Sequence, residues 1–136
     1  MPEKKTIEKA KTALRRGKSP STAAGAFVRE EIEHVRQGKH GARSPKQAIA
    51  IGLSEARRAG IPLEPPAKGR TRESTRRSAQ RDYEVGQGER RKRAPSKKRS
   101  AASKKALERE PRSTASKSAL SKQAKQAVER RRRRAG

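Results

Sequence analysis

Apolar residues in the first half of the chain recur every three or four positions, which is the spacing of one face of an α-helix. This periodicity predicts three helices, over residues 3–16, 20–37 and 45–59. The second and third of them carry large apolar residues that we expect to form a core or an interface: Phe27, Val28, Ile32, Val35, Ile49 and Leu53. The pattern therefore predicts an all-α module at the start of the chain.

Local signals mark the ends of these helices. A Ser-Pro pair stands before the second and the third helix, at residues 19–20 and 44–45. Serine caps the free N–H groups of a helix, and proline at the first helical position loses no hydrogen bond. Gly38 and Gly60 are suited to end the same two helices. The two segments align at an offset of 25 residues, so they reflect either shared capping signals or a duplicated helical unit.

The pattern changes beyond the third helix. Of the 15 Ile, Leu, Val and Phe residues, eleven lie within residues 1–63, whereas 25 of the 39 basic residues lie within residues 61–136. Those 15 residues are about 11% of the chain, too few for a highly charged chain to be packed throughout. We predict a helical module over residues 1–63, a linker over 64–69, and a basic, repeat-containing tail over 70–136 that is largely disordered and only partly or conditionally helical.

Two parts of this tail have helical character. Residues 70–84 fit a short basic helix. Residues 99–107 align with residues 112–120, with seven of nine positions identical, and each copy runs from Ser into Ala, Lys and Leu. We expect both copies to become helical when phosphates neutralise their charges.

Residues 27–43 and 44–60 read FVREEIEHVRQGKHGAR and SPKQAIAIGLSEARRAG. The second string resembles the signature of a family of small, basic bacterial proteins of uncharacterised function, and the resemblance covers roughly residues 17–63. It implies a bacterial, cytoplasmic protein and no particular reaction. The tail, rich in Ser, Ala, Lys, Arg and Pro, resembles in composition the tails of linker histones and of bacterial histone-like proteins.

The net charge of +25 and the pI near 11.7 indicate a polyanionic partner. Tyr83 is the only aromatic residue of the tail, and the chain has no Asn, so base stacking and adenine readout have little support. We therefore expect phosphate contact with weak sequence preference, to duplex DNA first and structured RNA second, in a histone-like protein of the nucleoid. The candidate contacts are Arg70, Arg72, Arg76, Arg77, Arg81, Arg90, Arg91, Lys92, Arg93, Lys97, Lys98, Arg99, Lys104, Lys105, Arg130, Arg131, Arg132, Arg133 and Arg134.

Other functions find little support in the sequence. Without Cys there are no disulfides and no cysteine-ligated metal, and no catalytic or nucleotide-binding motif occurs, so we expect neither an enzyme nor a cofactor. His34 and His40 are six residues apart, and one helix would place them on different faces, so we expect no metal site. No run of roughly 20 apolar residues could span a membrane, and residues 1–16 have no apolar signal segment.

The alternative is a protein-interaction module. The helix over residues 20–37 is nearly neutral in a strongly basic chain, and its apolar stripe could form the seam of a homodimer. Residues 17–63 would then carry the basic tail to RNA or to another acidic partner. If residues 1–63 alone bound DNA fully, the contacts would fall to Lys46, Arg57 and Arg58.

Overall fold

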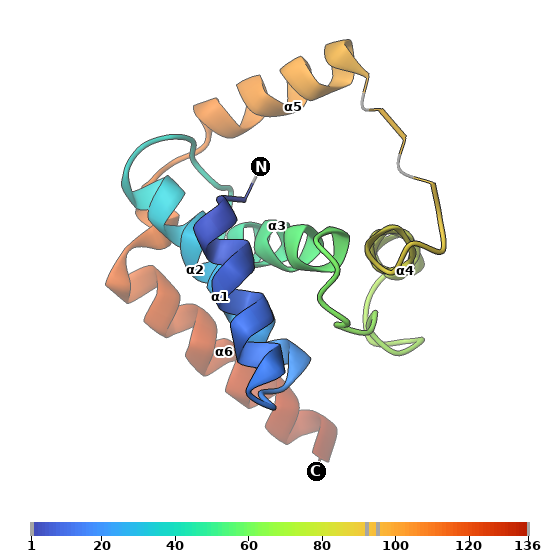
Figure 1. The fold of residues 1–136 in the computed structure, drawn as a ribbon. Helices are drawn as coiled ribbons and strands as arrows, with labels where there is room; N and C mark the ends of the chain where they lie inside the picture. Colours follow the sequence, from blue (N-terminus) through green and yellow to red (C-terminus); the bar gives the residue numbers. More distant parts are fainter. Residues whose placement is uncertain (1, 92, 95, 136) are drawn as a thin grey trace. The chain divides into compact units, whose positions relative to one another are not determined.

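The computed structural model describes residues 2–91, 93–94 and 96–135, and the regular elements in these residues are all helical (Figure 1). They are α1 (Lys4–Arg15), α2 (Pro20–Arg36), α3 (Pro45–Arg58), α4 (Glu73–Gly86), α5 (Lys97–Arg109), the short 3₁₀ helix η1 (Ser113–Ala115) and α6 (Lys117–Ala135). The all-α prediction is confirmed. The three helices expected in the first half of the chain lie within one residue of their predicted limits.

The expectation of a largely disordered tail over residues 70–136 was wrong, because α4, α5 and α6 fold most of this segment. That expectation rested on the scarcity of large apolar residues, but polar caps start two of these helices. Ser96 Oγ accepts the backbone N–H of Arg99 at 3.4 Å, and Ser116 Oγ accepts that of Ala119 at 3.2 Å. Alanine and lysine, both good helix formers, then continue each helix.

Contacts divide the chain into two compact units. Unit 1 comprises Met1–Glu31 and Ala50–Ala94, and unit 2 comprises Ile32–Ile49 and Pro95–Gly136. The division crosses α2 and α3, so each of these helices supplies residues to both units. The basic second half of the chain is shared in the same way, because α4 belongs to unit 1 and α5 and α6 belong to unit 2.

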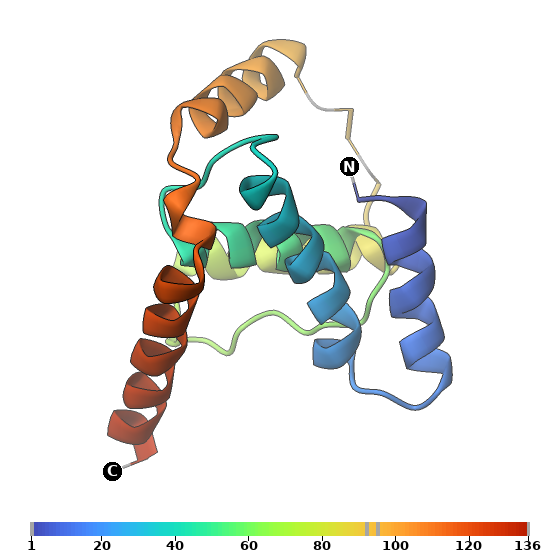
Figure 2. The same ribbon diagram turned by 90° about the vertical axis from the view of Figure 1, so that its left-hand side faces the viewer.

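Unit 1 is packed around Phe27, whose side chain is fully buried. In both views α1 runs beside α2, and the first turns of α2 lie in this unit (Figures 1 and 2). Small side chains at the contacts let the helix backbones approach closely. The other buried residues of this core are Ala10, Ala23, Ala24, Ala56 and Ile61.

Helix α4 approaches α3 closely at a glycine and makes polar contacts with it. A Cβ atom on Gly86 would lie 1.7 Å from the carbonyl oxygen of Arg57, so only glycine allows the two backbones to meet there. Ala79 of α4 is buried, and Ser54 Oγ donates a hydrogen bond to Asp82 Oδ2 at 2.6 Å. The close approach at Gly86 and the hydrogen bond to Asp82 therefore help to hold α4 in unit 1.

Unit 2 has a separate small core in which Val35 is fully buried. Backbone hydrogen bonds join two distant segments in this unit. The N–H of Gly41 donates to the carbonyl of Leu107 at 2.8 Å, and the N–H of Ala42 donates to the carbonyl of Pro111 at 3.1 Å. The alanines buried with Val35 come from both segments: Ala42, Ala48 and Ala115.

The six apolar residues that the sequence groups into one set contribute to two cores. Phe27 and the half-buried Leu53 belong to the core of unit 1. Val35 and the half-buried Ile32 belong to the core of unit 2. Two further members of the set are half-buried, namely Val28 and Ile49.

A group of buried carboxyl side chains lies in unit 1. Glu31 is 4% exposed, and Glu30 and Glu55 are each 9% exposed. Burial raises the pKa of Glu55 to about 8, and a hydrogen bond to Glu31 and the charges of Glu31 and Glu30 act in the same direction. Glu30 Oε1 also accepts the backbone N–H of Glu3 at 2.8 Å. Glu55 is thus held as a neutral acid inside a basic protein near neutral pH.

The close approach of α3 and α4 predicts the effect of a single methyl group. Gly86→Ala should destabilise unit 1 by about 1–3 kcal/mol, because the new Cβ atom would overlap the carbonyl oxygen of Arg57. Gly25→Ala is the matched control, since no atom lies within 4 Å of its new Cβ and alanine favours the middle of α2 by up to about 1 kcal/mol. Thermal unfolding followed by circular dichroism measures both. Equal midpoints for the two variants would contradict this packing.

The buried acid predicts how stability depends on pH. The folded chain keeps the proton of Glu55 up to about pH 8, whereas the unfolded chain releases it near the usual pKa of 4.5. This contribution to the free energy of unfolding is therefore complete below about pH 4.5 and is lost as the pH rises to about 8. In denaturant titrations, Glu55→Gln should flatten this fall, while Glu89→Gln, at an exposed position, should keep it. An unchanged slope in the Glu55 variant would argue against the neutral acid.

Candidate nucleic-acid interface

Two arginines of α4 lie on the face of the helix that points away from the interior of unit 1, and a third, Arg76, is half-buried. Ala79 is buried, whereas Arg77 and Arg81, one turn apart, are exposed. Two grooves of about 470 and 640 Å³ run along this face, and both are lined by Ser78 and Arg90. We call their basic lining the α4 arginine surface: Arg76, Arg77, Arg81, Arg90, Arg91 and Arg93.

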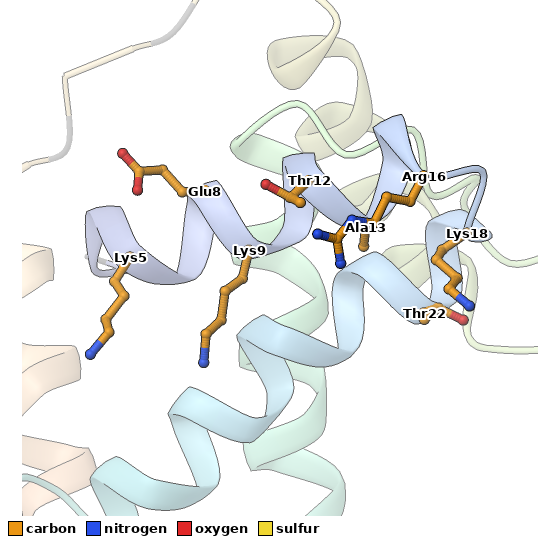
Figure 3. Close-up of a pocket in the computed structure, with 8 residues that line it drawn as sticks. All are labelled: Lys5, Glu8, Lys9, Thr12, Ala13, Arg16, Lys18 and Thr22. Atoms are coloured by element: carbon orange, nitrogen blue, oxygen red, sulfur yellow. The ribbon is translucent and has the colours of Figure 1, made fainter.

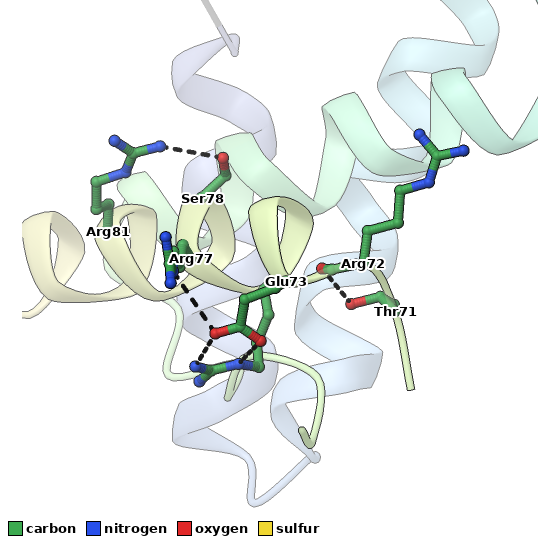
Figure 4. Close-up of polar contacts among 7 residues, drawn as sticks. Thr71, Arg72, Glu73, Arg77, Ser78 and Arg81 are labelled. Atoms are coloured by element: carbon green, nitrogen blue, oxygen red, sulfur yellow. Dashed lines mark hydrogen bonds and ion pairs between the residues drawn. The ribbon is translucent and has the colours of Figure 1, made fainter. Parts of the chain in front are cut away.

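A glutamate in the first turn of α4 orients two of these arginines (Figure 4). Arg76 donates from Nη2 to Glu73 Oε1 at 2.6 Å and from Nε to Oε2 at 3.1 Å, and Arg77 Nε lies 3.6 Å from Oε1. The hydrogen bond from Arg76 lowers the pKa of Glu73, and the same bond raises the pKa of Arg76. Arg77 keeps most of its side chain, 75%, exposed. One carboxylate therefore positions two guanidinium groups and neutralises only one charge.

A second glutamate fixes the segment that follows α4. Glu84 accepts hydrogen bonds from Gln80 Nε2 at 3.1 Å and from Arg90 Nε at 2.9 Å, and these bonds lower the pKa of Glu84. Because Arg90 lies beyond the end of α4, this ion pair folds the following segment back onto the helix. The chain after Gly86 thereby adds its basic residues to the same surface.

Three members of the α4 arginine surface carry uncompensated charge. Arg81 donates to Ser78 Oγ at 3.2 Å (Figure 4). Within the described residues, no ion pair joins Arg81, Arg91 or Arg93 to a carboxylate. Their guanidinium groups can each present several N–H donors to an anion without breaking an existing salt bridge.

Helices α5 and α6 expose basic residues over most of their surface. All residues of α5 are exposed except Leu107, which is half-buried. The five arginines at residues 130–134 are also exposed, and because a helical turn has 3.6 residues they point in all directions around α6. The predicted contacts that lie on α5 are Lys97, Lys98, Arg99, Lys104 and Lys105.

The other predicted contacts lie outside these groups. Arg70 and Arg72 are exposed just before α4, and the Arg72 side chain extends away from Arg77 and Arg81 (Figure 4). The structure thus gathers six of the predicted basic residues into one surface and leaves these two apart from it. The remaining predicted contact, Lys92, lies outside the described residues.

Arg57 has a structural role that the sequence does not reveal. It is only 8% exposed, and it donates from Nε to the carbonyl of Leu63 at 3.1 Å and from Nη2 to that of Glu64 at 3.2 Å. Burial lowers its pKa, which the nearby Asp82 partly offsets. Arg58 is exposed and lies 3.9 Å from the same aspartate. The Arg57 guanidinium therefore holds the chain that leaves α3 and is not placed to contact phosphate.

A second basic groove, which the sequence analysis did not identify, lies on α1. It has a volume of about 480 Å³ and also includes the beginning of α2. Lys5 and Lys9 are one turn apart and extend to the same side of α1, whereas Glu8 points away from them (Figure 3). The spacing of four residues between these two lysines is the feature of the sequence that could have predicted a shared basic face. We call this lining the α1 groove: Lys5, Glu8, Lys9, Thr12, Ala13, Arg16, Lys18 and Thr22.

The two histidines lie closer together in unit 2 than the sequence suggests. Their separation was expected from one continuous helix, but α2 ends at Arg36 and Gly38 turns the chain with a φ of 79°. The rings of His34 and His40 meet edge to face, with centroids 6.4 Å apart. Their spacing in sequence is therefore no argument against a shared role.

Comparison with known proteins identifies a related family for part of the chain. Residues 3–68, slightly under half of the chain, are similar to a family of unknown function, DUF6496. The matched region contains α1, α2 and α3, in agreement with the resemblance to an uncharacterised family, and it ends before α4. No curated protein and no solved structure matches the chain. Among the described residues, none of the helices combines the length and the apolar character needed to cross a membrane.

Proposed function

We propose that this protein binds nucleic acid, with duplex DNA as the preferred partner, by neutralising backbone phosphates with little regard to sequence. The observation that carries the proposal is the α4 arginine surface, in which six arginines line two adjoining grooves. Arg81, Arg91 and Arg93 offer charge that no carboxylate in the described residues takes up. In a bacterial cell, such binding would place the protein at the nucleoid.

The chemistry of the surface suits phosphates better than bases. Guanidinium groups form paired hydrogen bonds with phosphate oxygens, and each phosphate neutralised on DNA releases bound counterions. The lining of the two grooves contains no aromatic residue on which a base could stack. Affinity should therefore come from charge and depend strongly on salt.

Both units of the chain supply charge for this binding. Unit 1 has 20 basic and 10 acidic residues, a net charge of +10, and unit 2 has 19 basic and four acidic residues, a net charge of +15. Unit 2 has the greater excess of basic over acidic residues, and most of its basic residues lie on α5 and α6. We therefore propose that α5 and α6 attract the polyanion through their net charge. The α4 arginine surface, whose side chains are positioned by ion pairs, would contact the phosphates directly.

The alternative of a dimer built on α2 has less to support it. Phe27 and Val35, the two residues of its apolar stripe that would contribute most, are fully buried in the cores of the chain itself. A seam would have to rely on the half-buried Val28 and Ile32. Nucleic-acid binding is therefore the function that we favour.

Binding to duplex DNA, single-stranded DNA and structured RNA, each titrated at several salt concentrations, tests the proposal. If about 8 phosphates are neutralised, the logarithm of the association constant for duplex DNA should fall against the logarithm of salt with a slope of about −7. Unrelated duplex sequences should bind alike. A flat salt response, or a strong preference for one sequence, would contradict binding through phosphates.

Replacing two arginines tests the α4 arginine surface itself. Arg77→Gln/Arg81→Gln should make the salt slope less steep by about 2 and lower affinity by about one to two orders of magnitude at 0.1 M salt. The matched control is Arg15→Gln/Arg29→Gln, which removes the same charge from exposed positions on α1 and α2. Equal losses in the two double variants, measured by fluorescence anisotropy, would mean that net charge alone determines binding.

The end of α6 provides a test of the charge on unit 2. Replacing the five arginines at residues 130–134 with glutamine should make the salt slope less steep by up to about 4–5, and should weaken all duplex sequences equally. Glutamine is also a good helix former, so the circular dichroism spectrum should be preserved. If the slope and the affinity stay the same while the helix is intact, this run does not contact phosphate.

A further inference from the structure

The α1 groove and the α4 arginine surface give unit 1 two basic sites. In the α1 groove, lysines at residues 5, 9 and 18 and the guanidinium of Arg16 stand with the hydroxyls of Thr12 and Thr22 (Figure 3). Among the described residues, no ion pair joins any of these four cations to a carboxylate. The one acidic residue of the lining, Glu8, points away from the two lysines on either side of it. The groove is thus equipped to receive an anion.

The two sites are separate surfaces of unit 1. No residue lines both of them. Ala10 of α1 and Ala79 of α4 are buried, whereas Arg16 and Lys18 at the first site and Arg77 and Arg81 at the second are exposed. In Figure 4, α4 lies in front of α3 and of α1. The α4 arginine surface and the α1 groove therefore lie on different helices at different depths of the unit.

We propose that unit 1 binds two nucleic-acid segments at once, one along the α4 arginine surface and one along the α1 groove, and thereby bridges them. This proposal rests on the function proposed above and adds a second binding site to it. The protein would then link separate duplexes, or distant parts of one molecule, without having to form a dimer.

The geometry of the α1 groove fits a phosphate backbone. Lys5 and Lys9 are separated by about 6 Å along the helix axis, and a DNA strand carries one negative charge per roughly 3.4 Å of its axis. The two ammonium groups can therefore contact nearby phosphates of one strand. The threonine hydroxyls offer further donors to the same oxygens, as serine and threonine do in other protein–DNA contacts.

A second segment explains the two surfaces better than a single duplex does. Duplex DNA is stiff over about 50 nm, whereas a unit of 76 residues has a radius of gyration of only about 11 Å. A short duplex held along α4 would have to bend sharply around the unit to reach α1, which lies behind α4 in Figure 4. Because both surfaces are positive, they also cannot pair with each other in two copies of the chain.

A capture assay with the full chain tests the bridging. One duplex of about 60 base pairs is fixed to beads, a second, fluorescent duplex is free, and the amount captured is measured as the protein concentration rises. If one chain has two sites, the amount of captured duplex should rise to a maximum and then decline with protein concentration, because excess protein saturates each duplex separately. Absence of capture at every protein concentration at which the chain binds duplex DNA would overturn the proposal.

Variants assign the second site to the α1 groove. Lys5→Gln/Lys9→Gln should reduce capture at least tenfold while lowering affinity for a single duplex less than tenfold. Lys11→Gln/Arg29→Gln, which removes the same charge from exposed positions that line neither site, should leave capture within about twofold of the unaltered chain. Circular dichroism checks that the helices are intact in each variant.

The remaining outcomes separate this proposal from the function on which it rests. If the chain fails to bind duplex DNA, the proposed function itself is wrong. If it binds DNA and Lys5→Gln/Lys9→Gln captures as well as the unaltered chain, the bridging site is not the α1 groove and the inference is wrong. In that case, loss of binding by this variant to vesicles containing anionic lipid would instead assign the groove to a membrane surface.

Discussion

The fold depends on the close approach of helix and loop backbones at small residues. A Cβ atom on Gly52 would lie 2.7 Å from Val28 Cα, and one on Gly86 would lie 1.7 Å from the Arg57 carbonyl oxygen. In unit 2 a Cβ atom on Gly41 would lie 1.7 Å from the carbonyl oxygen of Glu110. Contacts this close bury backbone and alanine surface, so a chain with one Phe and no Trp can still form two cores.

The sequence predicted the parts of the structure that depend on local periodicity and capping. Helices α1 to α3 follow from the spacing of Ile7, Ala10 and Leu14 and from the Ser-Pro pairs at residues 19–20 and 44–45. The helical order of the second half could not be predicted in this way, because large apolar side chains are scarce there. Many of the contacts that fold it are made by glycine, alanine, backbone and polar groups, whose partners are distant in the sequence and leave no periodic signal.

The candidate site was predictable in composition and not in arrangement. Arg76, Arg77 and Arg81 could be assigned to a basic helix from their spacing, but the ion pair that joins Arg90 to Glu84 crosses the end of α4. The α1 groove could not be predicted from charge density, because basic residues are less dense before residue 63 than beyond it and its lysines form a site only through their common orientation.

The acidic residues show how a chain of net charge +25 can fold and still present a basic surface. Glu30, Glu31 and Glu55 are buried, and burial together with mutual hydrogen bonding keeps Glu55 neutral near pH 7. Glu73 and Glu84 lie on α4, where they position arginines and compensate only part of their charge. The carboxylates on α4 therefore compensate only part of the positive charge that this helix exposes. The cations repel one another, and the proposed binding of a polyanion would relieve that repulsion and thereby raise the free energy of unfolding.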